Sequence, residues 1–129
     1  MTTILDSIIE GVLEDVKLRE IPLSEIRRKA EEAGPLRGAR RALSGSELKI
    51  ISEVKRSSPS KGPLAEIPDP ARLARQYQEA GASVISVLTE QRRFKGSIGD
   101  FLAVRNSVEI PLLRKDFIVS EFQIFESRA

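Results

Sequence analysis

The sequence predicts an α/β fold with a parallel sheet, and three observations support this prediction. From residue 48 onward, short apolar segments alternate with longer segments of helical spacing. The connections between them are short, and short loops between alternating strands and helices imply parallel strands. Two of the apolar segments run directly into a lysine, which suggests one site at the carboxyl edge of the sheet.

The first 47 residues are expected to form a helical extension. Apolar residues recur at helical spacing over residues 3–19, which predicts an amphipathic helix. A proline and a serine open a second predicted helix over about residues 22–33, and Gly34-Pro35 closes it. The Arg-, Gly- and Ser-rich segment that follows is expected to hold a short helix or an irregular turn around residues 39–43.

Residues 48–129 are expected to form a second region of three βα units. Its predicted elements are a strand at 48–55, a helix at 70–80, a strand at 83–88, a helix at 98–107, a strand at 110–115 and a last helix from residue 120. The middle strand is apolar on both faces, as a strand covered on both sides should be. Phe122 and Phe125 are expected to pack inward from the last helix, which reaches Ala129 without a stop signal.

Charged residues follow two of the predicted strands. Because side chains alternate along a strand, Glu53 and Lys55 share one face, and Lys115 shares a face with Leu113 and Phe117. Charges at the end of a buried strand are costly unless they pair or function. The pattern alone leaves two interpretations, an ion pair that closes the end of the sheet or a site for substrate. Lys115 can likewise simply reach solvent. Asp116 can orient or pair with a neighbouring cation, or form only a surface salt bridge.

Two loops carry residues that suit a ligand. The loop at residues 57–62 combines hydroxyls, including Ser58, with a lysine and a glycine, so it can surround an anion or be only a turn. Its spacing is not that of a nucleotide-binding loop. Phe94 lies in a basic loop after the middle strand, where an aromatic ring is not needed for the core; packing beneath the loop is the alternative.

Composition excludes several classes of function. The chain has no Cys and no His, so disulfides, Cys-ligated metal sites and a histidine base are excluded. The net charge is only +2, and no basic stripe with interleaved aromatic residues indicates a nucleic-acid partner. The first residues do not read as a signal peptide, and no apolar run reaches membrane length, so we expect a cytoplasmic protein without a membrane partner.

Three segments together resemble a known family. The segments are EVKRSSPSKG at residues 53–62, SVLTEQRRFKGS at 86–97 and PLLRKDF at 111–117. In this order and spacing they resemble indole-3-glycerol phosphate synthase, an enzyme of tryptophan biosynthesis. The resemblance implies a (β/α)8 TIM barrel of roughly 250 residues. We therefore expect the chain to hold the N-terminal part of such a barrel, truncated after about three βα units.

The resemblance also implies roles for individual residues. Lys115 matches the family's general acid, and Glu53 and Lys55 match residues that bind the substrate and assist catalysis. Ser58 matches a serine of the active-site loop, and Phe94 and Phe117 match phenylalanines that contact the aromatic ring of the substrate. The substrate is a small phosphorylated molecule, and the reaction uses no metal and no organic cofactor.

A hypothesis of a different class remains. The chain can be a non-catalytic half-barrel module that self-associates or pairs with a complementary half. Three parallel strands leave two exposed edges and an uncovered inner face, which favours association.

Overall fold

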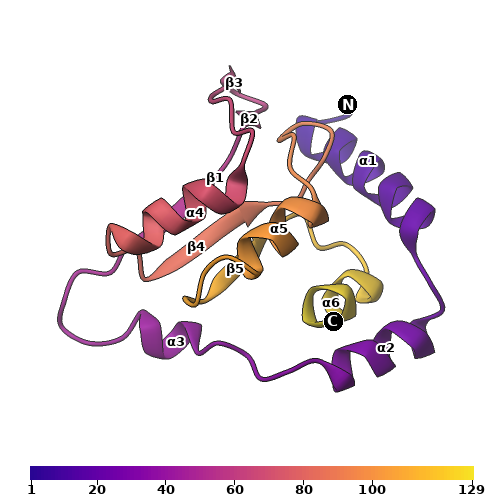
Figure 1. The fold of residues 1–129 in the computed structure, drawn as a ribbon. Helices are drawn as coiled ribbons and strands as arrows, with labels where there is room; N and C mark the ends of the chain where they lie inside the picture. The colour runs from indigo at the N-terminus through magenta and orange to yellow at the C-terminus, as the bar shows by residue number, and fades with distance from the viewer. The chain divides into compact units, whose positions relative to one another are not determined.

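The computed structural model describes residues 1–129, with six helices and five strands (Figure 1). In chain order the elements are α1 (Ile4–Arg19), α2 (Leu23–Glu32), α3 (Ala39–Ala42), β1 (Ile51–Val54), β2 (Ser57–Ser58), β3 (Gly62–Pro63), α4 (Pro70–Glu79), β4 (Val84–Leu88), α5 (Ile98–Arg105), β5 (Leu112–Lys115) and α6 (Glu121–Arg128). None of these helices has the length and apolar character needed to cross a membrane.

The chain packs as two compact units. One unit contains residues 1–35 and 117–129, and the other contains residues 36–116. This division follows packing, whereas the predicted boundary between residues 47 and 48 marks the beginning of the βα units and stays a prediction. Two differences follow from the packing: residues 36–47 group with the sheet, and the last helix groups with the first two.

The central sheet of the 36–116 unit is parallel, as predicted. Its strand order is β1-β4-β5, and both pairs of neighbours run parallel. β1 and β5 are shorter than predicted, because residues 48–50, 55 and 110–111 lie outside the paired segments. Leu48, for example, is 90% exposed and belongs to no strand. Together with helices after β1 and β4, this order is consistent with the first part of a TIM barrel.

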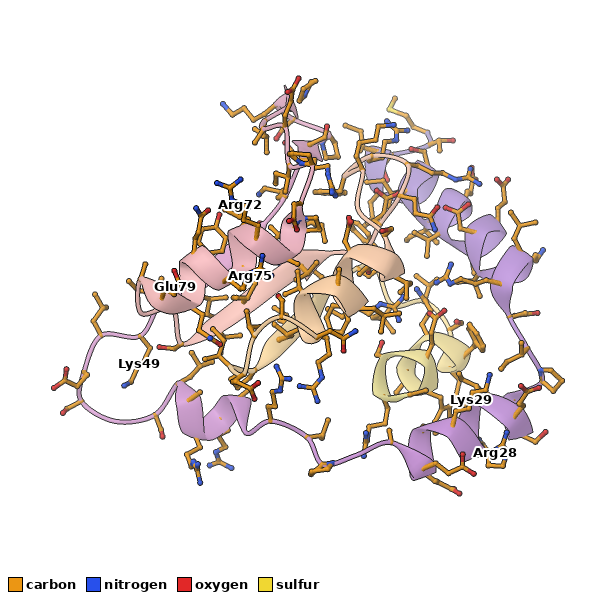
Figure 2. All side chains as sticks on the ribbon, in the orientation of Figure 1. Arg28, Lys29, Lys49, Arg72, Arg75 and Glu79 are labelled. Atoms are coloured by element: carbon orange, nitrogen blue, oxygen red, sulfur yellow. The ribbon has the colours of Figure 1, made fainter.

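Helices α4 and α5 cover one face of this sheet (Figure 1). The core between them is made of small and branched apolar side chains: Val54, Ala74, Ile85, Val87, Val104 and Val108. Asp69 and Ser97 cap the two helices by accepting backbone N–H groups in the first turn. Arg72, Arg75 and Glu79 on α4, labelled in Figure 2, are exposed. The helices are therefore amphipathic layers on the sheet, as the periodicity predicts.

Arg37 explains why residues 36–47 group with the sheet. Its guanidinium donates hydrogen bonds to the carbonyls of Arg105, Val108 and Ile110, at 3.1, 2.5 and 3.0 Å. These carbonyls lie at the end of α5 and in the loop to β5, where helix carbonyls lack partners within the helix. A residue predicted to belong to the N-terminal extension thus stabilises the βα region.

The 1–35/117–129 unit is a small helical cluster. Its core contains Ile8, Val12, Val16, Ile26 and Phe122. Phe125 packs against this core, so both phenylalanines of α6 point inward as predicted. Arg19 donates two hydrogen bonds to Glu126, at 2.7 and 3.2 Å, and links α1 to α6. On α2, Arg28 and Lys29 (Figure 2) pair with Glu32 and Glu25 one turn away, which stabilises an exposed helix modestly.

Candidate active site

A carboxylate flanked by cations lies on the sheet face opposite the α4–α5 layer. The register pairs Glu53 with Ser86, and Ser86 with Leu113, so the three side chains share this face. The Lys55 Nζ lies 3.0 Å from Glu53 Oε1, and the Ser86 hydroxyl donates to Glu53 Oε2 at 2.9 Å. Both carboxylate oxygens therefore have a fixed partner.

The electrostatics of the group keep Glu53 ionised. Partial burial raises the pKa of the Glu53 carboxyl, but the hydrogen bonds from Lys55 and Ser86 and the charges of Lys55 and Lys115 together outweigh burial. The pKa is thereby held below its ordinary value of 4.5. At neutral pH this side chain is a carboxylate that accepts hydrogen bonds and offsets two positive charges.

Lys115 completes the group from β5, which lies on the other side of β4 from β1. It pairs in register with Leu88 at the end of β5, two residues beyond Leu113 and on the same face. The side chain of Lys115 is exposed, whereas Lys55 is half-buried. The structure thus brings Glu53, Lys55 and Lys115 to one edge of the sheet, and an ammonium donor lies open to a ligand there.

A buried network holds the strand end that carries Lys115. Arg114 points to the opposite face, and its Nη2 lies 3.2 Å from Asp116 Oδ2. The two side chains are only 6% and 5% exposed, so this is a buried pair and not the surface salt bridge that the sequence left open. Thr89 joins them, because its hydroxyl donates to Asp116 at 2.6 Å and accepts from Arg114 Nε at 3.2 Å. The end of β5 is therefore tied to the end of β4.

Arg56 connects the loops around the same edge. It pairs with Asp100 in α5 and donates to the carbonyl of Ile67 at 3.1 and 2.8 Å. A further contact of 3.3 Å reaches the carbonyl of Lys95 in the loop after β4. Arg56 thereby joins the segments that follow β1 and β4. Arg56 was not among the predicted site residues, although it follows Lys55 directly.

Ser58 lies in a small hairpin that the sequence did not predict. β2 and β3 pair antiparallel, with Ser58 opposite Gly62. Gly62 has a φ of +64°, a left-handed conformation that favours glycine. The Ser58 hydroxyl accepts the Lys61 N–H at 3.2 Å, which is the bond of an ordinary turn. Exposed Ser60 and Lys61 form the tip of the hairpin.

The two predicted phenylalanines occupy different surroundings. Phe94 is half-buried in the loop after β4, and its backbone N–H donates to Glu90 at 2.8 Å. Phe117 follows β5, belongs to the 1–35/117–129 unit and packs against its helical core. Phe117 therefore makes the packing contacts of a core residue, and its contact with a substrate stays a prediction.

Two polar residues of this region were missed. Ser86 lies in the middle of an apolar strand, where period-two alternation places it on the face of Glu53 only once the register is known. Glu90 is 3% exposed and is the second residue after β4. Glu90 shows the same signal as Glu53 and Lys55, a charge at the end of an apolar strand, and could have been predicted from it. The described residues contain no group of three or more acidic side chains placed to hold a metal ion.

Comparisons of the sequence with known proteins identify a family. A family profile described as "Indole-3-glycerol phosphate synthase" matches residues 5–129. Proteins of that name from Paenarthrobacter aurescens and a Mycobacterium species (strain KMS) are each 58% identical, over 134 and 129 residues. Both alignments cover 98% of this chain, but 49% and 47% of the respective relative. The chain thus spans about half the length of these relatives, and across nearly all of its residues it belongs to the indole-3-glycerol phosphate synthase family.

Proposed function

We propose that this chain supplies the first part of the active site of an indole-3-glycerol phosphate synthase. The reaction converts 1-(2-carboxyphenylamino)-1-deoxyribulose 5-phosphate to indole-3-glycerol phosphate, carbon dioxide and water, so the enzyme is a carbon–carbon lyase. The observation that carries the proposal is the group of Glu53, Lys55 and Lys115 on one face, at the carboxyl edge of the sheet. Active sites of barrel enzymes form at this edge.

The proposed roles follow from exposure and charge. Lys115 is exposed and cationic, so it can give a proton to the substrate's carbonyl oxygen as the new carbon–carbon bond closes the ring; the resulting hydroxyl leaves as water in the later dehydration. Lys55 is held by Glu53 at 3.0 Å and binds the anionic part of the substrate or assists proton transfer. Glu53 stays ionised, orients Lys55 and offsets the repulsion between the two lysines.

The remaining predicted residues take binding roles in this proposal. Ser58 lies in the hairpin that follows β1, and the tip of this hairpin carries the Ser60 hydroxyl and Lys61. Phe94 and Phe117 contact the aromatic ring of the substrate. The partly exposed ring of Phe94 supports its role, and the resemblance of the PLLRKDF segment supports that of Phe117.

Product formation by two proteins tests the proposal. The full-length chain that carries this sequence is expected to form indole-3-glycerol phosphate, measured by the fluorescence of the indole product. Residues 1–129 alone are expected to show negligible turnover, because loss of positioned acid–base groups costs about 10²–10⁴-fold. Absence of product with the full-length chain would contradict the proposed activity. Turnover by residues 1–129 at the rate of the full-length chain would contradict the need for further strands.

A second candidate function rests on the sheet itself. β1 and β5 are the edge strands, and Ile51 and Leu113 on the uncovered face are 50% and 46% exposed. These features support self-association of residues 1–129 through edges or faces of the sheet. Sedimentation equilibrium at high micromolar concentration is expected to give a mass above that of one chain. A monomeric mass with cooperative unfolding would count against this candidate.

A further inference from the structure

A buried glutamate organises the loop that carries Phe94. Glu90 is 3% exposed, and its carboxylate lies inside the loop. Oε1 accepts the N–H of Arg92 at 2.9 Å, and Oε2 accepts the N–H groups of Arg93 and Phe94, both at 2.8 Å. Three successive backbone donors thus converge on one carboxylate, as in the anion-binding turns of other proteins.

The two residues after Phe94 have little conformational freedom. The Gly96 N–H donates to the carbonyl of Glu90 at 2.9 Å. A Cβ on Gly96 would lie 2.0 Å from the carbonyl oxygen of Leu88, so only glycine fits against the end of β4. Lys95 has a φ of 58°, an uncommon conformation for a residue with a side chain. Phe94 therefore lies between two constrained segments, the turn around Glu90 and the residues Lys95 and Gly96.

The charge of Glu90 matters in this arrangement. An ionised carboxylate only accepts hydrogen bonds, so both oxygens can face the three N–H donors. Glutamine has one acceptor oxygen and an NH₂ group, and the NH₂ would point at a backbone donor. Hydrogen bonds to charged groups are also stronger than neutral ones. Glutamine therefore fills the same volume but cannot hold the same turn.

We propose that Glu90 is a positioning residue, whose buried carboxylate holds the backbone of Arg92, Arg93 and Phe94 so that the Phe94 ring is presented to the substrate. This inference rests on the proposed function, in which Phe94 contacts the aromatic ring of the substrate. The competing explanation is that Glu90 only stabilises the fold. The two explanations differ in which amides lose protection and in which kinetic constant changes.

Amide hydrogen exchange, measured by NMR on residues 1–129, tests the hold on the loop. Glu90→Gln is expected to speed exchange at Arg92, Arg93 and Phe94 by about tenfold or more, since hydrogen bonds to a charged group are lost. The sheet amides of Ile85 and Thr89, which donate to the carbonyls of Pro111 and Lys115 respectively, should keep their protection. The matched control is Glu79→Gln, which alters an exposed glutamate of α4 (Figure 2).

The exchange experiment has outcomes that overturn the inference. Unchanged exchange at the three loop amides would show that the carboxylate does not hold them. If the Glu90→Gln variant loses amide protection throughout the protein, the Glu90→Asp variant is measured instead. The aspartate side chain keeps the charge but is shorter, so its carboxylate lies farther from the three N–H donors. Loss of the sheet protection in both variants would show that Glu90 supports the fold and not the loop specifically.

Kinetics of the full-length chain test the link to substrate binding. Glu90→Gln and Phe94→Leu are each expected to raise KM about tenfold and to change kcat by less than about threefold. The double variant should be no worse than Phe94→Leu alone, because both changes remove the same contact. Additive effects, or a loss confined to kcat, would overturn the inference.

The two measurements separate the inference from the proposed function. If the full-length chain makes no product, the proposed function fails, while hydrogen exchange still decides whether Glu90 holds the loop. If product forms and Phe94→Leu leaves KM unchanged, the proposed contact between Phe94 and the substrate is contradicted. The proposed positioning role of Glu90 is then contradicted as well.

Discussion

The two faces of the central sheet have opposite characters. The face under α4 and α5 is apolar, and Ile85, Val87 and Val104 in its core are fully buried. The other face carries Glu53, Lys55 and Lys115 at its carboxyl edge, together with half-exposed Ile51 and Leu113. One set of strands thus serves both stability and the proposed chemistry, because alternation sends neighbouring residues to opposite faces.

The largest expected effect belongs to the polar face. In the full-length chain, Lys115→Ala should lower kcat by about 10²–10⁴-fold while KM changes little, since a general acid acts in the transition state. Lys55→Ala should also raise KM, because Lys55 binds the anionic substrate. Steady-state kinetics on both variants measures the difference, with Lys17→Ala, an exposed lysine of α1, as control. An increase in KM alone for Lys115→Ala would make Lys115 a binding residue.

The apolar face should respond through stability. Ile85→Ala is expected to lower the free energy of unfolding of the 36–116 unit by about 2–5 kcal/mol, because it opens a cavity in a filled core. Leu113→Ala on the other face, where the side chain is 46% exposed, should cost less than about 1 kcal/mol. Urea unfolding followed by fluorescence of Tyr77, the one tyrosine, reports on this unit. Equal losses for the two variants would remove the contrast between the faces.

The smallest expected effect is a pH dependence of stability. Because the pKa of folded Glu53 lies below its ordinary value of 4.5, its ionised form stabilises the fold above that value. This contribution is lost as the pH falls from about 4.5 through the lower folded pKa. The difference in unfolding free energy between the wild type and Glu53→Gln should therefore be larger at about pH 7 than at about pH 3. A difference that stays constant or grows on acidification would contradict this account.

Much of the βα region could be predicted from the sequence. The strand and helix order, the parallel pairing and the helix starts at Asp69 and Ser97 follow from apolar periodicity and capping residues. The ends of β1 and β5 could not be predicted, because a strand extends only as far as its neighbour pairs with it. The β2–β3 hairpin was missed for a similar reason, since two residues per strand carry no periodic signal.

By itself the sequence determined the family, the secondary-structure order and the charged strand ends at Glu53, Lys55 and Lys115. Only the tertiary structure decided which groups meet. Register placed Ser86 against Glu53, the fold of one loop buried Glu90, and α6 packed with α1 and α2. The physical reason is that periodicity states which face of an element is apolar, whereas the partner of that face depends on contacts between residues far apart in the chain.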